Sequence, residues 1–231
     1  MASNLRMQGI YSFYKPKGPT SYDLVEKIKK ITKEKRVGHA GTLDPLADGV
    51  LIVAIGREFT KKITLFVDKE KEYLAKIKLG WESSTDDEQG EKKEINSSEA
   101  PKISELREKL SLFQGEIDQV PPDYSAIKVC GKRAYALSRK GIKINLKARK
   151  VLIKEIELLR YKYPEVDIRV VSGPGAYIRS LARDLGRELS TGAYLIGLTR
   201  TRIGNHLIKD SLDISEIKDE DINRLNNISL T

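Results

Sequence analysis

Residues 36–55 read RVGHAGTLDPLADGVLIVAI and join a polar loop to a continuous apolar segment. The loop, residues 36–49, contains three glycines and a proline, too many helix and strand breakers for a regular element. Residues 50–55 are all apolar, which predicts a strand buried on both faces. Because a buried strand fixes one end of the loop, polar side chains on it are well placed for function.

The flanking sequence predicts helices and strands in irregular alternation. Thr20 and Asp23 are spaced as a helix cap, and the apolar residues that follow have helical periodicity. In residues 73–79, Tyr73, Ala75, Ile77 and Leu79 alternate with Leu74, Lys76 and Lys78, which is typical of a half-exposed strand. An α+β fold around a mixed, largely antiparallel sheet is therefore expected. Further strands are predicted at 10–14, 126–129, 151–159, 166–171 and 194–201, and helical segments at 24–31, 59–67, 106–113, 134–139 and 178–189.

Two charged segments are expected at the surface. Residues 82–98 are acidic, serine-rich and without periodicity, so we expect a mobile loop that faces solvent. Arg179, Arg183 and Arg187 are spaced four residues apart, which predicts a basic ridge along one face of the last helix.

The chain of 231 residues is expected to form a single domain, residues 1–231, since no internal repeat or linker is visible. No apolar stretch approaches the roughly 20 residues that span a bilayer, and residues 1–6 do not resemble a signal peptide. We therefore expect a cytoplasmic protein with no membrane association. Cys130 is the single cysteine and is interpreted as a packing residue.

The net charge of +9 is concentrated in one region. Twelve Lys and Arg residues lie between Ser125 and Lys162 against only Glu155 and Glu157. Such a surface suits a polyanion, because each neutralised phosphate releases condensed counterions. A lysine-rich solvated face remains the alternative.

Residues on the glycine-rich loop could carry chemistry, namely His39, Asp44 and Asp48. Each also has a structural interpretation, because Asp before Pro is a common turn residue and an isolated His often serves packing. Their spacing matches no established zinc motif. The turn at residues 172–175, SGPG, could hold a phosphate at a helix start but lacks the Walker lysine.

Six segments in collinear order resemble bacterial tRNA pseudouridine-55 synthases, the TruB family, over roughly residues 9–204. The twelve-residue segment at 38–49 is highly specific. The other segments are residues 14–21 (YKPKGPTS), Tyr73 with its strand, residues 120–128 (VPPDYSAIK), residues 175–181 (GAYIRSL), and Leu198 with Arg200.

The resemblance implies a pseudouridine-synthase fold with a thumb-like basic excursion at about residues 120–146, acting on the T-stem loop of tRNA. It implies that Asp44 is the nucleophile, Arg179 its partner, and Tyr73 the residue that stacks on the base and serves in proton removal. Substrate contacts are implied for a second group: His39 in base extrusion, Tyr177 and Leu198 lining the pocket, and Lys17, Lys128 and Arg200. No metal, organic cofactor or obligate protein partner is expected, and the protein is expected to be a monomer.

The expected reaction breaks the bond from ribose C1′ to N1 of uracil, turns the base, and joins C1′ to C5. A carboxylate such as Asp44 could attack the ribose, attack the base or remove a ribose proton. Because a stacked uridine cannot reach an enclosed carboxylate, the nucleotide must flip out, which costs a few kcal/mol.

Two features depart from the family pattern. Pro174 and Ala176 stand where the family usually has Lys and Thr, which removes a charge and a hydroxyl beside Arg179. The chain ends at Thr231 after an acidic segment, and we expect no separate C-terminal RNA-binding domain.

Three alternatives remain open from the sequence. The chain could be a non-catalytic RNA-binding protein or RNA chaperone, a carboxylate-dependent glycosidase or nucleosidase, or a pseudouridine synthase for another RNA. Replacement of Asp44 distinguishes an enzyme from a non-catalytic RNA-binding protein. Analysis of the products identifies a glycosidase or nucleosidase, and a panel of RNA substrates identifies a synthase for another RNA.

Overall fold

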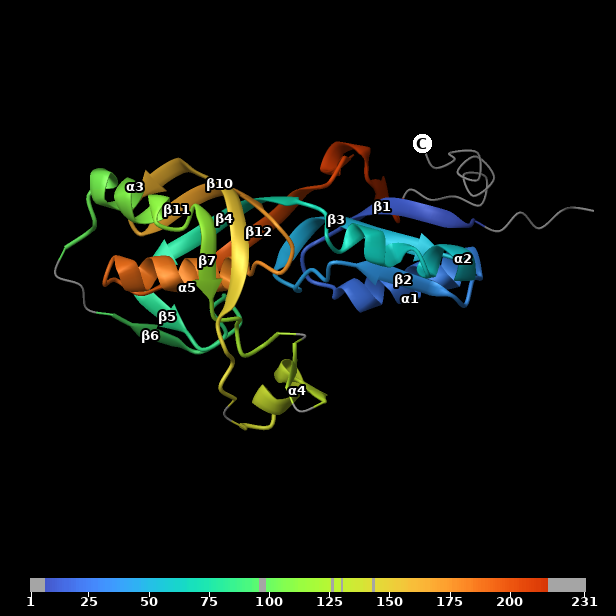
Figure 1. The fold of residues 1–231 in the computed structure, drawn as a ribbon, viewed down its shortest axis with the longest axis horizontal. Helices are drawn as coiled ribbons and strands as arrows, with labels where there is room; N and C mark the ends of the chain where they lie inside the picture. Colours follow the sequence, from blue (N-terminus) through green and yellow to red (C-terminus); the bar gives the residue numbers. More distant parts are fainter. Residues whose placement is uncertain (1–6, 96–98, 126, 130, 143, 216–231) are drawn as a thin grey trace, which may run out of the picture. The chain divides into compact units, whose positions relative to one another are not determined.

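The structure is a computed structural model that describes residues 7–95, 99–125, 127–129, 131–142 and 144–215. The chain divides into two compact units. Unit 1 comprises the chain up to Tyr73 together with the part from Thr199 onward, and unit 2 comprises Leu74–Leu198. Strands and helices are mixed in both (Figure 1), so the predicted α+β fold is confirmed. The predicted single-domain organisation stays a prediction.

Unit 1 is built around a buried strand, β3 (Ala47–Ile55). Its sheet has the order β14-β1-β3-β12, with β2 also paired to β3 and β13 to β12. β14 runs parallel to β1, whereas β1 and β2 are antiparallel to β3. The other elements are β1 (Gly9–Lys15), α1 (Ser21–Thr32), β2 (Val37–Ala40), α2 (Arg57–Thr60), the 3-10 helices η1 (Ile63–Phe66) and η2 (Ile208–Asp210), β13 (His206–Leu207), β14 (Leu212–Asp213), and the unit 1 parts of β4 (Lys71–Leu79) and β12 (Ala193–Ile203).

Local sequence explains how α1 and β3 form. Thr20 accepts a hydrogen bond from the Asp23 backbone, and the Asp23 carboxylate accepts one from the Thr20 backbone, so both N-terminal donors are satisfied as predicted. Residues 50–55 are fully buried, which confirms the prediction of a strand covered on both faces. Phe13 on β1 and Ile28 on α1 complete the core on one face of β3.

Unit 2 holds a second set of strands in the order β12-β4-β11-β10-β7. β10 is antiparallel to both β11 and β7. β8 and β9 form a small separate sheet, and α4 lies apart from β7 and β10 (Figure 1), in the region expected to be a thumb-like excursion. The bounds are β5 (Trp81–Ser83), β6 (Lys92–Glu94), α3 (Ile103–Ser111), β7 (Gly115–Gln119), β8 (Lys128–Val129), β9 (Lys132–Arg133), α4 (Ala134–Ser138), β10 (Arg149–Lys162), β11 (Glu165–Ser172) and α5 (Ile178–Glu188).

Three local predictions need correction. Residues 37–40 form β2 rather than loop, because they pair with β3, which itself begins at Ala47. The helical spacing at 59–67 gives two short helices, α2 and η1, with a break at Lys61 and Lys62. Residues 81–94 are a paired hairpin, β5 with β6, rather than an unstructured loop.

Some predictions fall on residues outside the described part of the chain. These are the start of the predicted strand at Ala126, the packing role of Cys130, and the acidic residues from Glu216 onward. Within the described residues, no helix is both long and apolar enough to cross a bilayer.

Candidate active site

The loop that carries Asp44 is held at its backbone by neighbouring segments of unit 1. The Ser21 hydroxyl donates to the Leu43 carbonyl (3.0 Å) and accepts from the Leu43 amide (2.9 Å). The Ala47 amide donates to the Asp44 carbonyl (3.0 Å), which closes a turn around Asp44. The buried Leu43 side chain anchors the loop next to Asp44. The half-buried Asp44 side chain therefore extends from a backbone that is fixed in position.

A buried arginine supports the same loop. Arg200 is only 1% exposed and donates to the carbonyls of Val50 (2.8 Å) and Gly41 (2.7 Å). Its side chain also hydrogen-bonds Tyr73 and is attracted to the Asp44 carboxylate, although burial still lowers its pKa below the usual value. Arg200 therefore connects the loop, the buried strand and Tyr73, which is itself 6% exposed.

Lys15, at the end of β1, is a second buried cation beside the loop. Its ammonium donates to the carbonyls of Pro16 and Pro19, both at 2.8 Å. Burial lowers the pKa of Lys15 to about 8, while the negative charges of Asp48 and Asp44 act in the opposite direction. The Asp44 carboxylate therefore interacts electrostatically with two buried cations, Lys15 and Arg200.

His39 and Asp48 occupy the two ends of the loop. His39 lies on β2, with Nε2 3.2 Å from the Thr42 hydroxyl. Burial, and secondarily the Arg200 charge, lower the pKa of His39, which disfavours the charged form of its ring. Asp48 accepts a hydrogen bond from the Tyr14 hydroxyl, and its buried Oδ1 atom has no hydrogen-bond partner among the residues that the structure describes.

Unit 2 contains the third predicted catalytic residue, Arg179, in the first turn of α5. It is 5% exposed and donates to the carbonyls of Thr85 (3.2 Å) and Tyr124 (2.9 Å). Its Nη1 atom lies 3.5 Å from the carboxylate of Asp87, which is 3% exposed. The guanidinium is thus fixed by a buried ion pair and two carbonyls, a geometry suited to orienting a charged group.

The predicted basic ridge on α5 is wrong, because Arg179 and Arg183 are largely buried in ion pairs, and the third arginine, Arg187, lies 3.4 Å from the Asp184 carboxylate. Arg183 lies 2.8 Å from the Asp86 carboxylate and 2.9 Å from that of Asp184, and its side chain is only 14% exposed. Only Arg187, whose side chain is 63% exposed, faces solvent. The acidic hairpin supplies Asp86 and Asp87 as partners of Arg183 and Arg179, so the predicted solvent exposure is wrong for these two carboxylates. The other acidic side chains of the hairpin, Glu82, Glu88, Glu91 and Glu94, are exposed as predicted.

The remaining predicted substrate contacts lie in varied settings. Tyr177 immediately precedes α5 and is half-buried, as is Leu198 on β12. Lys17 is exposed in the turn after β1, and Lys128 is exposed on β8 of the excursion. Their roles toward substrate stay predictions, since the structure gives their positions alone.

Comparison with known proteins identifies the family. The chain matches the N-terminal domain of the TruB family of pseudouridylate synthases over residues 29–178. The chain belongs to the TruB family. TruB relatives named tRNA pseudouridine synthase B include one from Clostridium tetani, 44% identical over 94% of this chain and 74% of the relative. Another, from Parabacteroides distasonis, is 46% identical over 91% of this chain and 92% of the relative.

Solved structures place the same fold in larger assemblies. The chain is similar to a chain in the crystal structure of a Cbf5-Nop10-Gar1 complex, with TM-score 0.71 and 29% identity over 92% of this chain. It is also similar to a chain in a structure of H/ACA RNP bound to a substrate RNA containing 2′-deoxyuridine, with TM-score 0.70 and 27% identity over 97% of this chain. This chain spans 54% and 57% of those two chains, just over half of each. The predicted resemblance to TruB enzymes is confirmed.

Sequence reasoning missed several residues that build this TruB site. Lys15 was visible only as part of a motif, although a lysine at the end of a mostly apolar strand, as in residues 9–15, could have indicated a buried cation. Asp86 and Asp87 stood in a segment interpreted as solvent-facing, and nothing local distinguished them from exposed acids. Gln119 carried no sequence signal, because its importance depends on contacts with α5.

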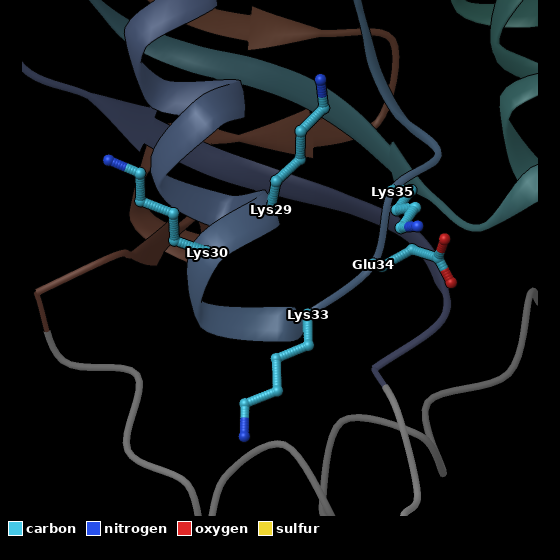
Figure 2. A pocket seen from close by; sticks show the side chains of 5 residues that line it. All are labelled: Lys29, Lys30, Lys33, Glu34 and Lys35. Carbon is cyan, nitrogen blue, oxygen red and sulfur yellow. The ribbon is translucent and has the colours of Figure 1, made fainter.

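A separate hollow on unit 1 is unsuited to a small ligand. It is lined by Lys29, Lys30, Lys33, Glu34 and Lys35, at the end of α1. Figure 2 shows that Lys29, Lys30 and Lys33 point away from one another rather than toward a common point. Among the residues that the structure describes, no group of three or more His, Cys, Asp or Glu side chains is arranged to hold a metal ion.

Proposed function

We propose that this TruB protein isomerises a uridine of transfer RNA, the T-loop uridine at position 55, to pseudouridine, with Asp44 as the reacting carboxylate. The observation that carries the proposal is the construction of the Asp44 loop: a closed turn, fixed by Ser21 and Arg200, that holds one carboxylate beside two buried cations. The relatives named tRNA pseudouridine synthase B support transfer RNA as the substrate.

The chemistry requires a carboxylate that reacts without being neutralised. An unperturbed aspartate pKa of about 3.9 already keeps the group ionised at pH 7. Lys15 and Arg200 therefore serve orientation and compensate for the loss of water when RNA covers the site. Asp44 would attack ribose C1′ or the base, or remove a ribose proton, and the detached uracil would then rotate before C1′ joins C5.

The other predicted residues fit parts of this reaction. Tyr73 offers an aromatic ring. A hydrogen bond between its buried side chain and Arg200 fixes the orientation of the ring. We propose that this ring stacks on the flipped uracil and that Tyr73 serves in proton removal, while His39 assists extrusion of the base. Stacking offsets part of the few kcal/mol that flipping costs. Arg179 is proposed as the cation that assists Asp44 during the reaction.

Binding of the T-stem loop is assigned to the basic excursion at about residues 120–146 and to Lys17. Lys128, Lys132 and Arg133 are exposed on β8 and β9, where they can contact phosphates. Tyr177 and Leu198 are proposed to line the base pocket, and Arg200 to contribute to substrate binding through the loop and the Tyr73 side chain that it supports. The cytoplasmic location and the monomeric state stay predictions from the sequence.

The test compares wild type, Asp44→Asn and Asp68→Asn on an unmodified transfer RNA transcript, with pseudouridine mapped chemically. Asp68 is an exposed carboxylate in unit 1 and controls for the loss of one charge. Asp44→Asn should lower conversion at the T-loop uridine by at least about 10³-fold, as loss of a reacting group does, while Asp68→Asn should match wild type. Free uracil as product would indicate a glycosidase, and equal activity of Asp44→Asn and wild type would remove Asp44 from the chemistry.

A further inference from the structure

One buried glutamine joins the end of β7 to the start of α5. Gln119 is 2% exposed, and its amide makes two hydrogen bonds with the backbone of one residue, Tyr177. Its Nε2 atom donates to the Tyr177 carbonyl (3.1 Å), and its Oε1 atom accepts from the Tyr177 amide (2.8 Å). An amide used at both ends in this way fixes the position and the direction of the Tyr177 backbone.

The start of α5 depends on such support. Tyr177 is the N-cap residue, and its side chain makes no capping bond. The residues before it, Pro174 and Gly175, are exposed, and Gly175 adopts φ +81°. Arg179 lies only two residues after Tyr177, so a shift of the Tyr177 backbone moves the guanidinium.

The same β7 end meets α5 through three further bonds. Ser180 and Arg183 both donate to the Val120 carbonyl at 2.8 Å. Arg179 donates to the Tyr124 carbonyl at 2.9 Å. Residues 119–124 are the first part of the chain that leads into the basic excursion, so the root of the excursion and the first two turns of α5 are bound together within unit 2.

We propose that Gln119 is a positioning residue that sets the Tyr177 backbone, and with it the Arg179 guanidinium, relative to the root of the basic excursion. When the excursion binds RNA, the first turn of α5, and with it the Arg179 guanidinium, already has the position that the reaction requires. This inference rests on the proposed function, because it needs Arg179 to act in the isomerisation. Gln119 itself touches neither base nor ribose in this role.

The test uses the full chain with Gln119→Ala, Gln119→Glu and the matched control Gln114→Ala. Gln114 is exposed, five residues earlier, and donates to the Lys154 carbonyl at 3.3 Å. Single-turnover rates at saturating enzyme are measured together with transfer RNA affinity and thermal unfolding. A rate under these conditions reports each bound complex and does not depend on the fraction of enzyme that is folded.

Gln119→Ala should lower the single-turnover rate by at least about 10-fold, on the scale of a small misplacement of a reacting group, with transfer RNA affinity near that of wild type. Gln119→Glu keeps the acceptor for the Tyr177 amide but not the donor, so its rate should lie between those of wild type and Gln119→Ala. Gln114→Ala should match wild type.

An unchanged rate per bound complex in Gln119→Ala would overturn the inference while leaving the proposed function intact. If the unfolding temperature of this variant were lower at the same time, Gln119 would be a stabilising residue only. A wild-type protein that forms no pseudouridine in transfer RNA overturns the proposed function and this inference with it. If Gln119→Ala does not fold, the nearly isosteric Gln119→Glu decides by the same criteria.

Discussion

Two polar loops, residues 38–49 and 83–90, look different in sequence and turn out to be built by the same principle. The first is glycine-rich and carries Asp44. The buried Arg200 donates to the Gly41 carbonyl of this loop and to the adjacent Val50 carbonyl, and the buried Lys15 interacts electrostatically with Asp44 and Asp48. The second is acidic, and its buried carboxylates, Asp86 and Asp87, pair with arginines of α5. The buried charges at the first loop are on residues outside it, Lys15 and Arg200. The buried charges at the second loop are on its own residues, Asp86 and Asp87.

The difference teaches where each loop can tolerate change. A carbonyl acceptor is supplied by any residue type, so the first loop depends on its backbone path and on the lysine and arginine that approach it. The second loop depends on its own carboxylates, because removal of one partner from a buried ion pair leaves an uncompensated charge. The predictions below test this contrast from the largest expected effect to the smallest.

The largest effect is expected for Gly49→Ala in the first loop. Gly49 adopts φ +108°, and an added Cβ would overlap the Arg200 carbonyl, which as backbone cannot move aside. The free energy of unfolding should fall by about 3 kcal/mol or more, measured by urea denaturation. Gly90→Ala is the matched change in the second loop. Its Cβ would lie 2.6 Å from the Ser83 and Ser84 hydroxyls, which can rotate away, and 2.6 Å from one backbone atom, the Thr85 amide nitrogen. At Gly49 three backbone atoms of Arg200 lie within 2.8 Å and φ is positive, so the loss at Gly90 should be smaller. An equal loss in both variants would contradict the proposed dependence on backbone path.

Asp87→Asn should have the next largest effect. It leaves the buried Arg179 guanidinium without its carboxylate partner, and breaking a buried pair costs about 3–5 kcal/mol in other proteins. An asparagine oxygen still accepts a hydrogen bond, so we expect a loss of about 2 kcal/mol in unfolding free energy together with a clear fall in single-turnover rate. Wild-type stability and rate would show that the two carbonyl contacts alone hold Arg179.

The titration of Lys15 should cause the reaction rate to fall at alkaline pH. Its pKa of about 8 means that its positive charge beside Asp44 is present below pH 8 and lost above it, so the wild-type rate should fall as pH rises through about 8. Lys15→Met should be slower at pH 7 and lack this fall. Lys71→Met is the control: Lys71 is also buried, with a pKa of about 8, but its ammonium donates to the Val67 and Lys69 carbonyls. A fall that disappears in Lys71→Met instead would reassign the titration.

The contribution of Lys15 to the free energy of unfolding should rise with pH, whereas its contribution to the reaction rate falls. Its folded-state pKa of about 8 lies below the ordinary value of 10.5. Between these values the unfolded chain binds more protons than the folded chain, so the contribution of Lys15 to the unfolding free energy rises with pH. Urea denaturation at pH 7.5 and 9.5 should show this rise in wild type and a smaller one in Lys15→Met.

The smallest effect is expected for Asp86→Asn. Burial raises the pKa of Asp86 despite the nearby charges of Arg183 and Arg179, so its ionised form is disfavoured in the folded protein and this contribution weakens stability as pH rises above about 4. Arg183 keeps Asp184 and the Val120 carbonyl as partners. At pH 7 the unfolding free energy should therefore stay within about 1 kcal/mol of wild type. A loss as large as that of Asp87→Asn would show that the two neighbouring carboxylates are equivalent.

Much of the fold followed from local pattern. The capping residues Thr20 and Asp23 fixed the start of α1, and the apolar run at residues 50–55 identified the central strand, because such signals depend on neighbours in sequence. The alternation at residues 73–79 was equally direct, since buried and exposed positions alternate along β4. The β2 strand was missed because Gly38 was counted as a strand breaker. The pairing of residues 37–40 with β3 stabilises a strand despite this glycine.

The candidate site was only partly accessible from sequence. The loop around Asp44 was identifiable because its residue types and spacing are specific to the TruB family, and Arg179 was identifiable for the same reason. The burial of Arg183 and of the carboxylates in residues 83–90 was not, since a charged residue in a polar segment is usually exposed. Only pairing with a helix nearly a hundred residues later reverses that expectation.

By itself, the sequence determined the mixed α+β character, the central buried strand, and the family to which the Asp44 loop belongs, because these depend on short-range periodicity and on a contiguous motif. The tertiary structure alone decided which charges are buried and what holds them: Arg200 against the Val50 and Gly41 carbonyls, Arg179 and Arg183 against the carboxylates of Asp87 and Asp86, and Gln119 against Tyr177. The physical reason is that a buried charge or amide needs partners that replace its lost water, and for these side chains the partners lie far away in the sequence. Those partners are brought together by folding and leave no local pattern.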